Sequence, residues 1–306
     1  MEKISSSIYQ FIRAHVEEQD ILLEEPMCKH TTFRVGGTAQ CLIRISSRDQ
    51  LVVLIPYLKK VDIPYFILGN GSNLLVGDKG YDGIVLQIGS RFSGISLEGT
   101  YIRVQSGALL SQTAAFALEN SLTGLEFASG IPGTVGGGVV MNAGAYEGEM
   151  SQVVEQVTVM NEQGEIMELN KETMEFGYRT SIIKNRPFIV LEVLMRLEAG
   201  QKDQIRTKME ELSRRRREKQ PLEYASAGST FKRPEGHFAG KLIMEAGMRG
   251  YSIGGAQVSE KHCGFIINTG RASAADVAEV IREVQDRVKE RFGVTLEREV
   301  IYLGEF

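Results

Sequence analysis

Two glycine-rich stretches carry the residues of this chain that are best suited to holding a phosphate. The first, GNGSN, covers Gly69–Asn73, and the second, GIPGTVGGG, covers Gly130–Gly138. Glycine leaves the main chain open to a phosphate oxygen, and Ser72, Thr134 and Asn142 add hydroxyl and amide groups. Taken alone, either stretch is more typical of tight turns and close backbone packing. Together, the two stretches favour a diphosphate held between two loops.

The stretches do not follow the two common nucleotide-binding patterns. No G-x-G-x-x-G opens a helix after a strand, and the sequence has no G-x-x-x-x-G-K-[ST]. We therefore expect neither a Rossmann domain nor a P-loop. No histidine, cysteine and acidic residues have metal-ligand spacing, so we expect no metal site.

The composition is that of a soluble globular protein. Of 306 residues, 42% are hydrophobic and 24% are charged, and the net charge of -4 argues against general binding of nucleic acid or anionic membrane. No apolar run is long enough to span a bilayer, and MEKISSSIYQ at the start lacks an apolar signal core. Cys28, Cys41 and Cys263 follow no pattern, which favours reduced thiols. We expect a cytoplasmic protein without membrane insertion or nucleic-acid binding.

The glycine stretches are expected to lie among mixed helices and strands. Apolar residues at helical spacing predict a helix over residues 4–16. Ser47 and Gln50 predict a capping box for a helix that extends to Leu58 and is kinked or ended by Pro56. Further helices are expected at residues 111–120, 202–219 and 237–247, and from a cap at Ser273 to a stop at Gly293.

The first glycine stretch is expected to follow a strand, and further strands are expected along the chain. A hairpin over residues 153–170 is predicted to turn at Gln163–Gly164. Because strands and helices do not alternate regularly, the fold class is α+β. The other expected strands cover residues 41–46, 65–69, 83–89, 101–107, 188–198, 256–259, 264–268 and 296–304.

Five segments resemble a known enzyme family in the same order. TTFRVGGTA, LGNGSNLLV and GIPGTVGGGVVMNAGAY are similar to the FAD-binding domain of the vanillyl-alcohol oxidase type. FGYRTS and AGSTFKRP are similar to the UDP-N-acetylenolpyruvoylglucosamine reductase family. The resemblance extends from about Thr31 to the closing LEREVIYLG, which is most of the chain. It implies two FAD-binding subdomains, residues 1–75 and 76–205, and a C-terminal substrate-binding domain, residues 206–306.

The resemblance implies a flavoenzyme of peptidoglycan precursor synthesis, and thus of cell wall biogenesis, cell shape and cell division. Non-covalent FAD would be the cofactor and NADPH the hydride source. The substrate would be the nucleotide sugar UDP-N-acetylglucosamine enolpyruvate, and the product UDP-N-acetylmuramate. The modest length of the C-terminal part favours the form of the family without an extra loop over the substrate.

The resemblance also implies where FAD lies. The diphosphate would lie between the glycine stretches, and the NAGA segment would lie near the flavin ring. The expected cofactor contacts are Gly69, Asn70, Gly71, Ser72, Asn73, Leu74, Gly130, Ile131, Pro132, Gly133, Thr134, Gly136, Gly137, Asn142, Ala143, Gly144 and Ala145.

Three residues match the family's catalytic positions. Ser229 is the implied proton donor, and Arg179 would bind the substrate carboxylate through two parallel hydrogen bonds. Glu299 is either a neutral donor or an anion that orients the other two. Glu297 would lie on the same side of a strand, but the family pattern favours Glu299.

The substrate phosphates need cations, and the candidates for substrate binding are Tyr178, Lys219, Lys232 and Arg233. Arg233 departs from relatives that carry an uncharged amide at this position. Tyr146 and Tyr178 could stack on a ring, but core packing is the more common fate of such residues. Residues 213–219, SRRRREK, are expected to form a solvated helix face, and His262 a structural or substrate-orienting residue.

Two other functions remain open at this point. A flavin oxidase or dehydrogenase could share the FAD-binding part but use another substrate, although AGSTFKRP and LEREV favour the reductase. A nucleotide-binding module without catalysis would be colourless, whereas a flavoprotein is yellow.

Overall fold

The computed structural model describes residues 4–306 and has the expected α+β fold. The chain divides into two compact units, and each unit is assembled from three separate segments. Unit 1 contains residues 1–23, 41–70 and 83–216, and unit 2 contains residues 24–40, 71–82 and 217–306. The division into residues 1–75, 76–205 and 206–306 stays a prediction.

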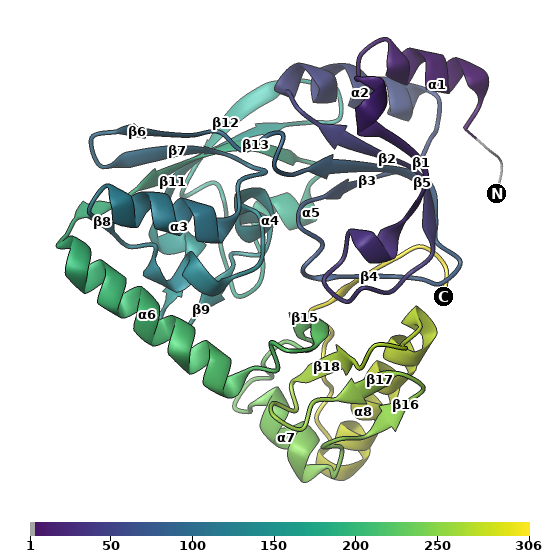
Figure 1. Ribbon diagram of the computed structural model, residues 1–306, viewed down its shortest axis with the longest axis vertical. Coiled ribbons are helices and arrows are strands. Elements are labelled where there is room, and N and C mark those ends of the chain that lie inside the picture. Colours follow the sequence, from purple (N-terminus) through teal and green to yellow (C-terminus); the bar gives the residue numbers. More distant parts are fainter. Residues whose placement is uncertain (1–3) are drawn as a thin grey trace. The chain divides into compact units, whose positions relative to one another are not determined.

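The first sheet of unit 1 has the order β1-β2-β5-β3, with β3 and β5 parallel. Its apolar side chains form one core with those of two helices, which lie beside it in Figure 1. The helices are α1 (Ser6–Arg13) and α2 (Arg48–Lys60), and the strands are β1 (Ile21–Pro26), β2 (Thr38–Ile45), β3 (Tyr65–Leu68) and β5 (Tyr81–Ile88).

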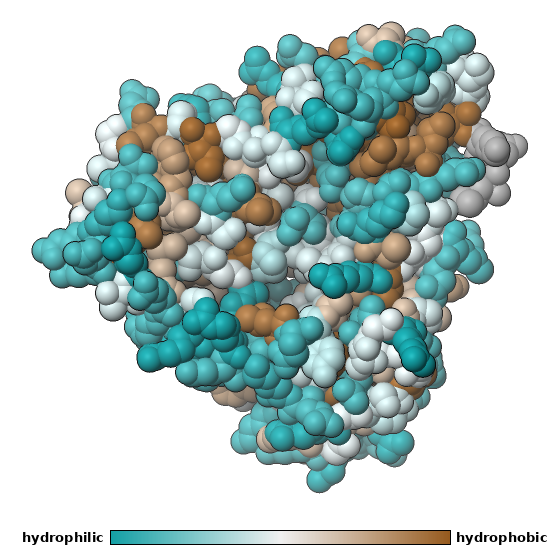
Figure 2. Space-filling model, in the orientation of Figure 1, coloured by the Kyte–Doolittle hydropathy of each residue, from teal (hydrophilic) through white to brown (hydrophobic). Residues whose placement is uncertain are grey.

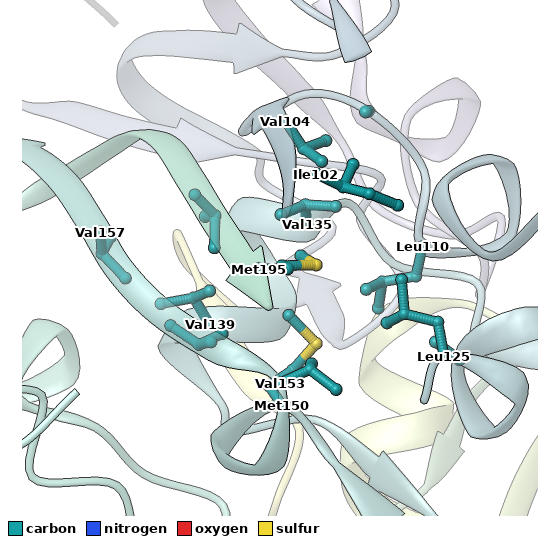
Figure 3. Close-up of a cluster of buried hydrophobic side chains, with 14 of the residues drawn as sticks. Ile102, Val104, Leu110, Leu125, Val135, Val139, Met150, Val153, Val157 and Met195 are labelled. Carbon is teal, nitrogen blue, oxygen red and sulfur yellow. The ribbon is translucent and has the colours of Figure 1, made fainter. Parts of the chain in front are cut away.

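The second sheet of unit 1 is antiparallel, with the order β12-β11-β13-β7-β6. Figure 3 shows the core that this sheet shares with α3 and α4, where Ile102 and Met195 of the sheet face Val135 and Val139 of α4. The elements are β6 (Ile95–Glu98), β7 (Tyr101–Gln105), β11 (Val154–Met160), β12 (Ile166–Asn170), β13 (Ile189–Arg196), α3 (Leu110–Glu119) and α4 (Val135–Val140).

The charged helix α6 (Lys202–Lys219) has the predicted bounds, and Figure 2 shows hydrophilic side chains along it at the lower left. Its buried side chains are Ile205 and Leu212. The smaller elements of unit 1 are β8 (Leu122–Thr123), β9 (Gly144–Ala145), β10 (Gly148–Glu149), α5 (Ile182–Asn185) and β14 (Glu198–Ala199).

Unit 2 is built on an antiparallel sheet of order β15-β18-β17-β16, against which α8 packs. As predicted, Ser273 caps α8 and Gly293 ends it in the left-handed conformation. In a separate pair, β19 is parallel to β4. The elements are β4 (Leu74–Val76), β15 (Ala225–Ser229), α7 (Ala239–Glu245), β16 (Ser252–Ile253), β17 (Ala256–Val258), β18 (Phe265–Asn268), α8 (Ala274–Phe292) and β19 (Ile301–Leu303).

Three local predictions departed from the structure. Of the two effects predicted for Pro56, ending the helix is wrong: α2 continues to Lys60, because buried Leu54, Ile55 and Leu58 anchor both sides of the proline. The Ser47 hydroxyl accepts from the Gln50 N–H as predicted, but the Gln50 side chain bonds to Ser46, so the capping box is incomplete. The strand predicted for residues 296–304 is limited to β19.

Candidate functional site

The two glycine stretches meet inside unit 1. A Cβ atom on Gly69 would lie 2.5 Å from Thr134 Oγ1, so only glycine allows this contact. The Asn70 side chain donates a hydrogen bond of 2.5 Å to the carbonyl oxygen of Pro132. Residues far apart in the sequence are therefore joined, as two loops around one ligand require.

Packing explains some of the glycines of the second stretch. Thr134 caps α4, since its hydroxyl accepts from the Gly137 N–H at 3.3 Å. A Cβ on Gly136 would lie 2.8 Å from Ser106 Cβ, whereas a Cβ on exposed Gly137 would meet only Thr134 Oγ1, at 3.5 Å. Gly136 is therefore needed for helix packing, and Gly137 leaves a stretch of main chain accessible. Cofactor contact at both positions stays a prediction.

A pocket of about 190 Å³ opens where the stretches meet. Both stretches contribute to it, and its lining is polar and apolar in about equal parts, with two arginines and three further glycine or serine positions after β5 and β7. The lining residues are Arg44, Ile45, Gly69, Asn70, Gln87, Gly89, Ser90, Arg91, Gly107, Leu109, Gln112 and Thr134. Accessible backbone, polar side chains and positive charge fit one portion of a dinucleotide such as FAD.

The turn that carries Arg179 is held against the NAGA segment by side-chain hydrogen bonds. Arg179 Nη2 donates to the Gly144 carbonyl oxygen at 3.1 Å. Asn142 is 1% exposed, and its amide donates to the Gly177 carbonyl at 3.0 Å and accepts from the Ser151 N–H at 2.9 Å. The structure thus brings together a predicted catalytic residue and the predicted flavin-side segment.

The backbone is strained at this place. Asn142, Tyr146 and Arg179 have φ angles of 41°, 59° and 55°. Asparagine tolerates this left-handed region, but other residues with a Cβ atom lose about 1–2 kcal/mol there. Such strain is maintained by the surrounding contacts and clusters at functional sites.

The end of α6 is solvated as expected at Arg214 and at residues 217–219, but Arg215 and Arg216 pack on other segments. Arg215 lies over the ring of Tyr146, with 4.7 Å between Cζ and the ring centroid, and the Tyr146 hydroxyl donates to the Leu212 carbonyl at 3.0 Å. A Cβ on Gly130 would lie 3.0 Å from Arg216 Nη1, and burial lowers the pKa of Arg216. Arg215 and Arg216 therefore pack on Tyr146 and on the first residue of the second glycine stretch.

Neither tyrosine candidate is a core residue. Tyr146 is 42% exposed and Tyr178 is 54% exposed. The Arg179 guanidinium lies 5.2 Å from the centroid of the Tyr178 ring. The prediction that core packing is the more common fate of these tyrosines is therefore wrong for both. An exposed ring beside an arginine is suited to contact a ligand.

In unit 2, Ser229 and Glu299 belong to adjacent backbone segments. The Glu299 N–H donates to the Thr230 carbonyl at 2.9 Å, and the Lys232 N–H donates to the Glu297 carbonyl at 2.9 Å. Ser229 is exposed at the end of β15 and follows Gly228, which has a φ of 76°. The serine hydroxyl is thus accessible, as a proton donor must be.

The first glycine stretch continues into unit 2 and reaches the same place. The Asn73 amide donates to the Glu299 carbonyl at 3.1 Å, and the Ile301 N–H donates to the Asn73 carbonyl at 3.0 Å. Asn73, a predicted cofactor residue, and Glu299, a predicted catalytic residue, are therefore joined by a hydrogen bond. In the same stretch, a Cβ on Gly71 would lie 2.0 Å from the His30 carbonyl oxygen, so this position requires glycine.

The predicted phosphate-binding cations differ in their surroundings. Lys232 Nζ pairs with Glu297 at 2.6 Å, so its charge is compensated. Arg233 Cζ lies 4.0 Å from the centroid of the Phe238 ring, and its Nε donates to the His237 carbonyl at 3.3 Å. Lys219 is exposed.

His262 has a structural place in unit 2. Its Nδ1 accepts from the Gly264 N–H at 3.1 Å, and the ring is edge-on to Phe265. Burial, with a smaller effect of the Lys219 charge, lowers the pKa of His262. A neutral, hydrogen-bonded imidazole agrees with the structural interpretation.

Sequence reasoning missed Ser106 and the cluster of Asp20, Arg44 and Arg91. The Ser106 hydroxyl is buried beside Gly136 and has no hydrogen-bond partner among residues 4–306. Asp20 is 2% exposed and pairs with Arg44 and Arg91. These residues are distant in the sequence and form no motif, so no local pattern could identify them.

Comparisons with known proteins agree with this geometry. Residues 39–170 match the FAD binding domain family, and residues 220–303 match the UDP-N-acetylenolpyruvoylglucosamine reductase, C-terminal domain family. Among the described residues, no helix is long and apolar enough to cross a membrane.

Full-length relatives carry the reductase name. The UDP-N-acetylenolpyruvoylglucosamine reductase of Caldanaerobacter subterraneus subsp. tengcongensis is 54% identical over 290 residues, which are 95% of this chain and 96% of that protein. That of Clostridium perfringens is 49% identical over 97% of both chains. The crystal structure of the Thermus caldophilus reductase has 37% identity and a TM-score of 0.79, and covers 93% of this chain and 98% of that one. The chain therefore belongs to the UDP-N-acetylenolpyruvoylglucosamine reductase family and contains its FAD-binding and C-terminal domains.

Proposed function

We propose that the protein reduces UDP-N-acetylglucosamine enolpyruvate to UDP-N-acetylmuramate, with NADPH as the hydride source. The observation that carries this proposal is the 54% identity to a reductase across 95% of the chain. The contacts of unit 1 and unit 2 support it, because each predicted site segment is held by hydrogen bonds from another predicted segment.

The chemistry divides between cofactor and chain. Bound FAD would supply the hydride. The two glycine stretches, including exposed Gly137, and the NAGA segment would hold the cofactor. Hydride arriving at the substrate methylene pushes negative charge onto the neighbouring carbon and its carboxylate. Arg179 would bind that carboxylate with its planar guanidinium, and the exposed Ser229 hydroxyl would protonate the carbon.

Glu299 would act beside Ser229 in one of two ways. As a neutral acid it would donate a hydrogen bond to the developing anion, and as an anion it would orient Ser229 or Arg179. The Glu299 backbone is already fixed by Thr230 and Asn73, which would limit the positions that its carboxyl group can reach. The Glu299→Gln variant distinguishes the roles, since it retains turnover only if the neutral form is the active one.

Tyr178, Lys219, Lys232 and Arg233 would bind the nucleotide-sugar substrate. Of these, Lys232 would have to exchange Glu297 for a phosphate oxygen. The three cysteines are free thiols, which is typical of a reducing compartment and supports a cytoplasmic location.

The test is an anaerobic absorbance experiment on the purified protein. We expect a flavin spectrum, bleaching by NADPH, and recovery of the spectrum when the enolpyruvyl substrate is added. A colourless protein would indicate a nucleotide-binding module instead. A flavin that is reduced by NADPH but not reoxidised by this substrate would indicate a different flavoenzyme. Heat or acid should release the flavin into the supernatant, since no covalent bond is proposed.

A further inference from the structure

We propose that Asp20, Arg44 and Arg91 form a clamp that positions the adenosine-phosphate end of FAD in the pocket of unit 1. The clamp would favour FAD over FMN, which lacks the adenosine. This inference rests on the proposed function, because it assumes that the chain binds FAD at the glycine stretches.

The centre of the clamp is a buried carboxylate. The side chain of Asp20 is 3% exposed, and Arg44 Nε and Arg91 Nε lie 3.0 and 2.9 Å from the same oxygen, Oδ1. A buried carboxylate is stable only when it is paired with cations or donors. One carboxylate neutralises one of the two guanidinium groups, so one positive charge is left in excess at the pocket.

Ion pairs and one hydrogen bond hold the two guanidinium groups at the pocket. Each arginine has Nε within ion-pair distance of Asp20, although Asp20 Oδ1 and Arg44 Nε form no hydrogen bond among the described residues, and Arg44 Nη2 donates to the carbonyl oxygen of Gln19. Both side chains still reach the surface, with exposures of 37% and 40%, and both line the pocket. Long side chains lose rotamer freedom when a ligand binds, and arginines that are already held lose less.

The pocket is too small for the whole cofactor but suits its adenosine-phosphate end. Its 190 Å³ is below the roughly 300–1,000 Å³ of sites that enclose a drug-sized ligand. Gly69, Asn70 and Thr134 connect it to the glycine stretches, which are the predicted diphosphate site. Gln87 and Gln112 add amide groups and Ser90 adds a hydroxyl, and these groups match the base edge and the ribose of an adenosine.

A purely structural ion-pair cluster is the competing explanation. Buried ion pairs contribute little net stability compared with apolar residues, so stability alone explains the cluster poorly. A structural cluster would affect the folded state but not the choice between flavins. The ratio of the dissociation constants for FMN and FAD therefore separates the two explanations.

The experiment measures this ratio on the full chain by displacement of bound FAD with FMN, followed through flavin fluorescence. Arg91→Gln leaves Asp20 paired with Arg44, so folding should be preserved. We expect the ratio to fall by about tenfold to a hundredfold, because FAD loses a charge-assisted hydrogen bond while FMN loses nothing. Arg44→Gln should act in the same direction, and Arg91→Lys should lie between Arg91→Gln and the unchanged protein.

The matched control is Arg103→Gln. Arg103 lies on β7, pairs with Glu192 of β13 at 2.7 Å and is not among the residues that line the pocket. It should leave the ratio unchanged. An unchanged ratio in both clamp variants, or an equal loss of FMN and FAD affinity, would overturn the clamp. If the unmodified protein binds neither flavin, the proposed function fails first, and that result is distinct from a failure of the clamp alone.

Discussion

Glycine has different roles at the glycine stretches of unit 1 and next to Ser229 in unit 2. In unit 1, Gly69 and Gly136 stand where a Cβ atom would meet Thr134 at 2.5 Å and Ser106 at 2.8 Å. In unit 2, Gly228 precedes Ser229 with a φ of 76°, and apart from its chain neighbours no atom of the described residues lies within 4 Å of a Cβ built on it. The first two glycines allow segments to approach each other, and the third allows the chain to turn.

This difference indicates how the two places depend on these glycines. A side chain at a close approach pushes two segments apart, so the damage should appear in packing and in the bound flavin. A side chain at a free turn costs only backbone strain. We therefore expect changes in unit 1 to act mainly on flavin retention, and changes near Ser229 to act on the step in which the substrate is reduced.

The largest effect is expected for Ser229→Ala. Reduction of the flavin by NADPH needs no proton donor to the substrate, so bleaching should stay near its normal rate. Reoxidation by the enolpyruvyl substrate should slow by about 10²–10⁴-fold, the usual effect of losing a positioned acid. Stopped-flow absorbance measures both steps. Equal slowing of the two steps would remove Ser229 from its role.

Arg179 sharpens the comparison, because it is a unit 1 residue that is expected to act on substrate reduction. Arg179→Ala should slow reoxidation by about 10²–10³-fold, while flavin content stays normal. Arg179→Lys keeps the charge but loses the planar pair of donors, so it should remain clearly impaired. Loss of flavin in either variant would show instead that the bond to Gly144 matters for the fold of the NAGA segment.

Gly136→Val tests the close approach. The added side chain would collide with Ser106 and should lower the free energy of unfolding by about 1–3 kcal/mol, with loss of bound flavin. Gly137→Ala is the matched control in the same helix, because its Cβ has room. It should not destabilise the fold, since alanine favours helices over glycine by up to about 1 kcal/mol. Flavin loss in Gly137→Ala at full stability would identify a direct cofactor contact.

The smallest effect is expected for Gly228→Ala. The φ of 76° should cost about 1–2 kcal/mol of stability without a collision. Gly247→Ala is the control, because Gly247 has a φ of 79° and also has nothing within 4 Å of a Cβ. The melting temperature should fall by a similar amount in both variants, but only Gly228→Ala should slow reoxidation of the flavin. Equal turnover in both would separate the turn from the chemistry of Ser229.

Local signals predicted much of the fold. Ser273 and Gly293 set the ends of α8, and Gly164 turns the hairpin of β11 and β12 with a φ of 84°. Pro56 does not end α2, because the apolar residues on both sides of it outweigh one missing hydrogen bond. Propensity is a local quantity, and burial on the sheet of unit 1 overrides it.

The site was predictable where motifs are compact and not where it depends on distant pairs. The glycine stretches and FGYRTS are each continuous, so sequence could find them. Asp20, Arg44 and Arg91 come from three separate segments and meet only after β2 and β5 pair. The Lys232–Glu297 pair likewise depends on a backbone bridge between Phe231 and Arg298. No single-residue preference encodes such contacts.

The pairing of β4 with β19 has a consequence for synthesis on the ribosome. Leu74–Val76 are translated early, but their partner Ile301–Leu303 is translated near the end of this chain. Until then β4 exposes an unpaired edge, which invites aggregation or chaperone binding. The late segment also carries Glu299, so cleavage after Leu296 would remove both the strand that pairs with β4 and a predicted catalytic residue. We expect copies truncated there to expose the β4 edge and, if Glu299 has its predicted role, to lose activity.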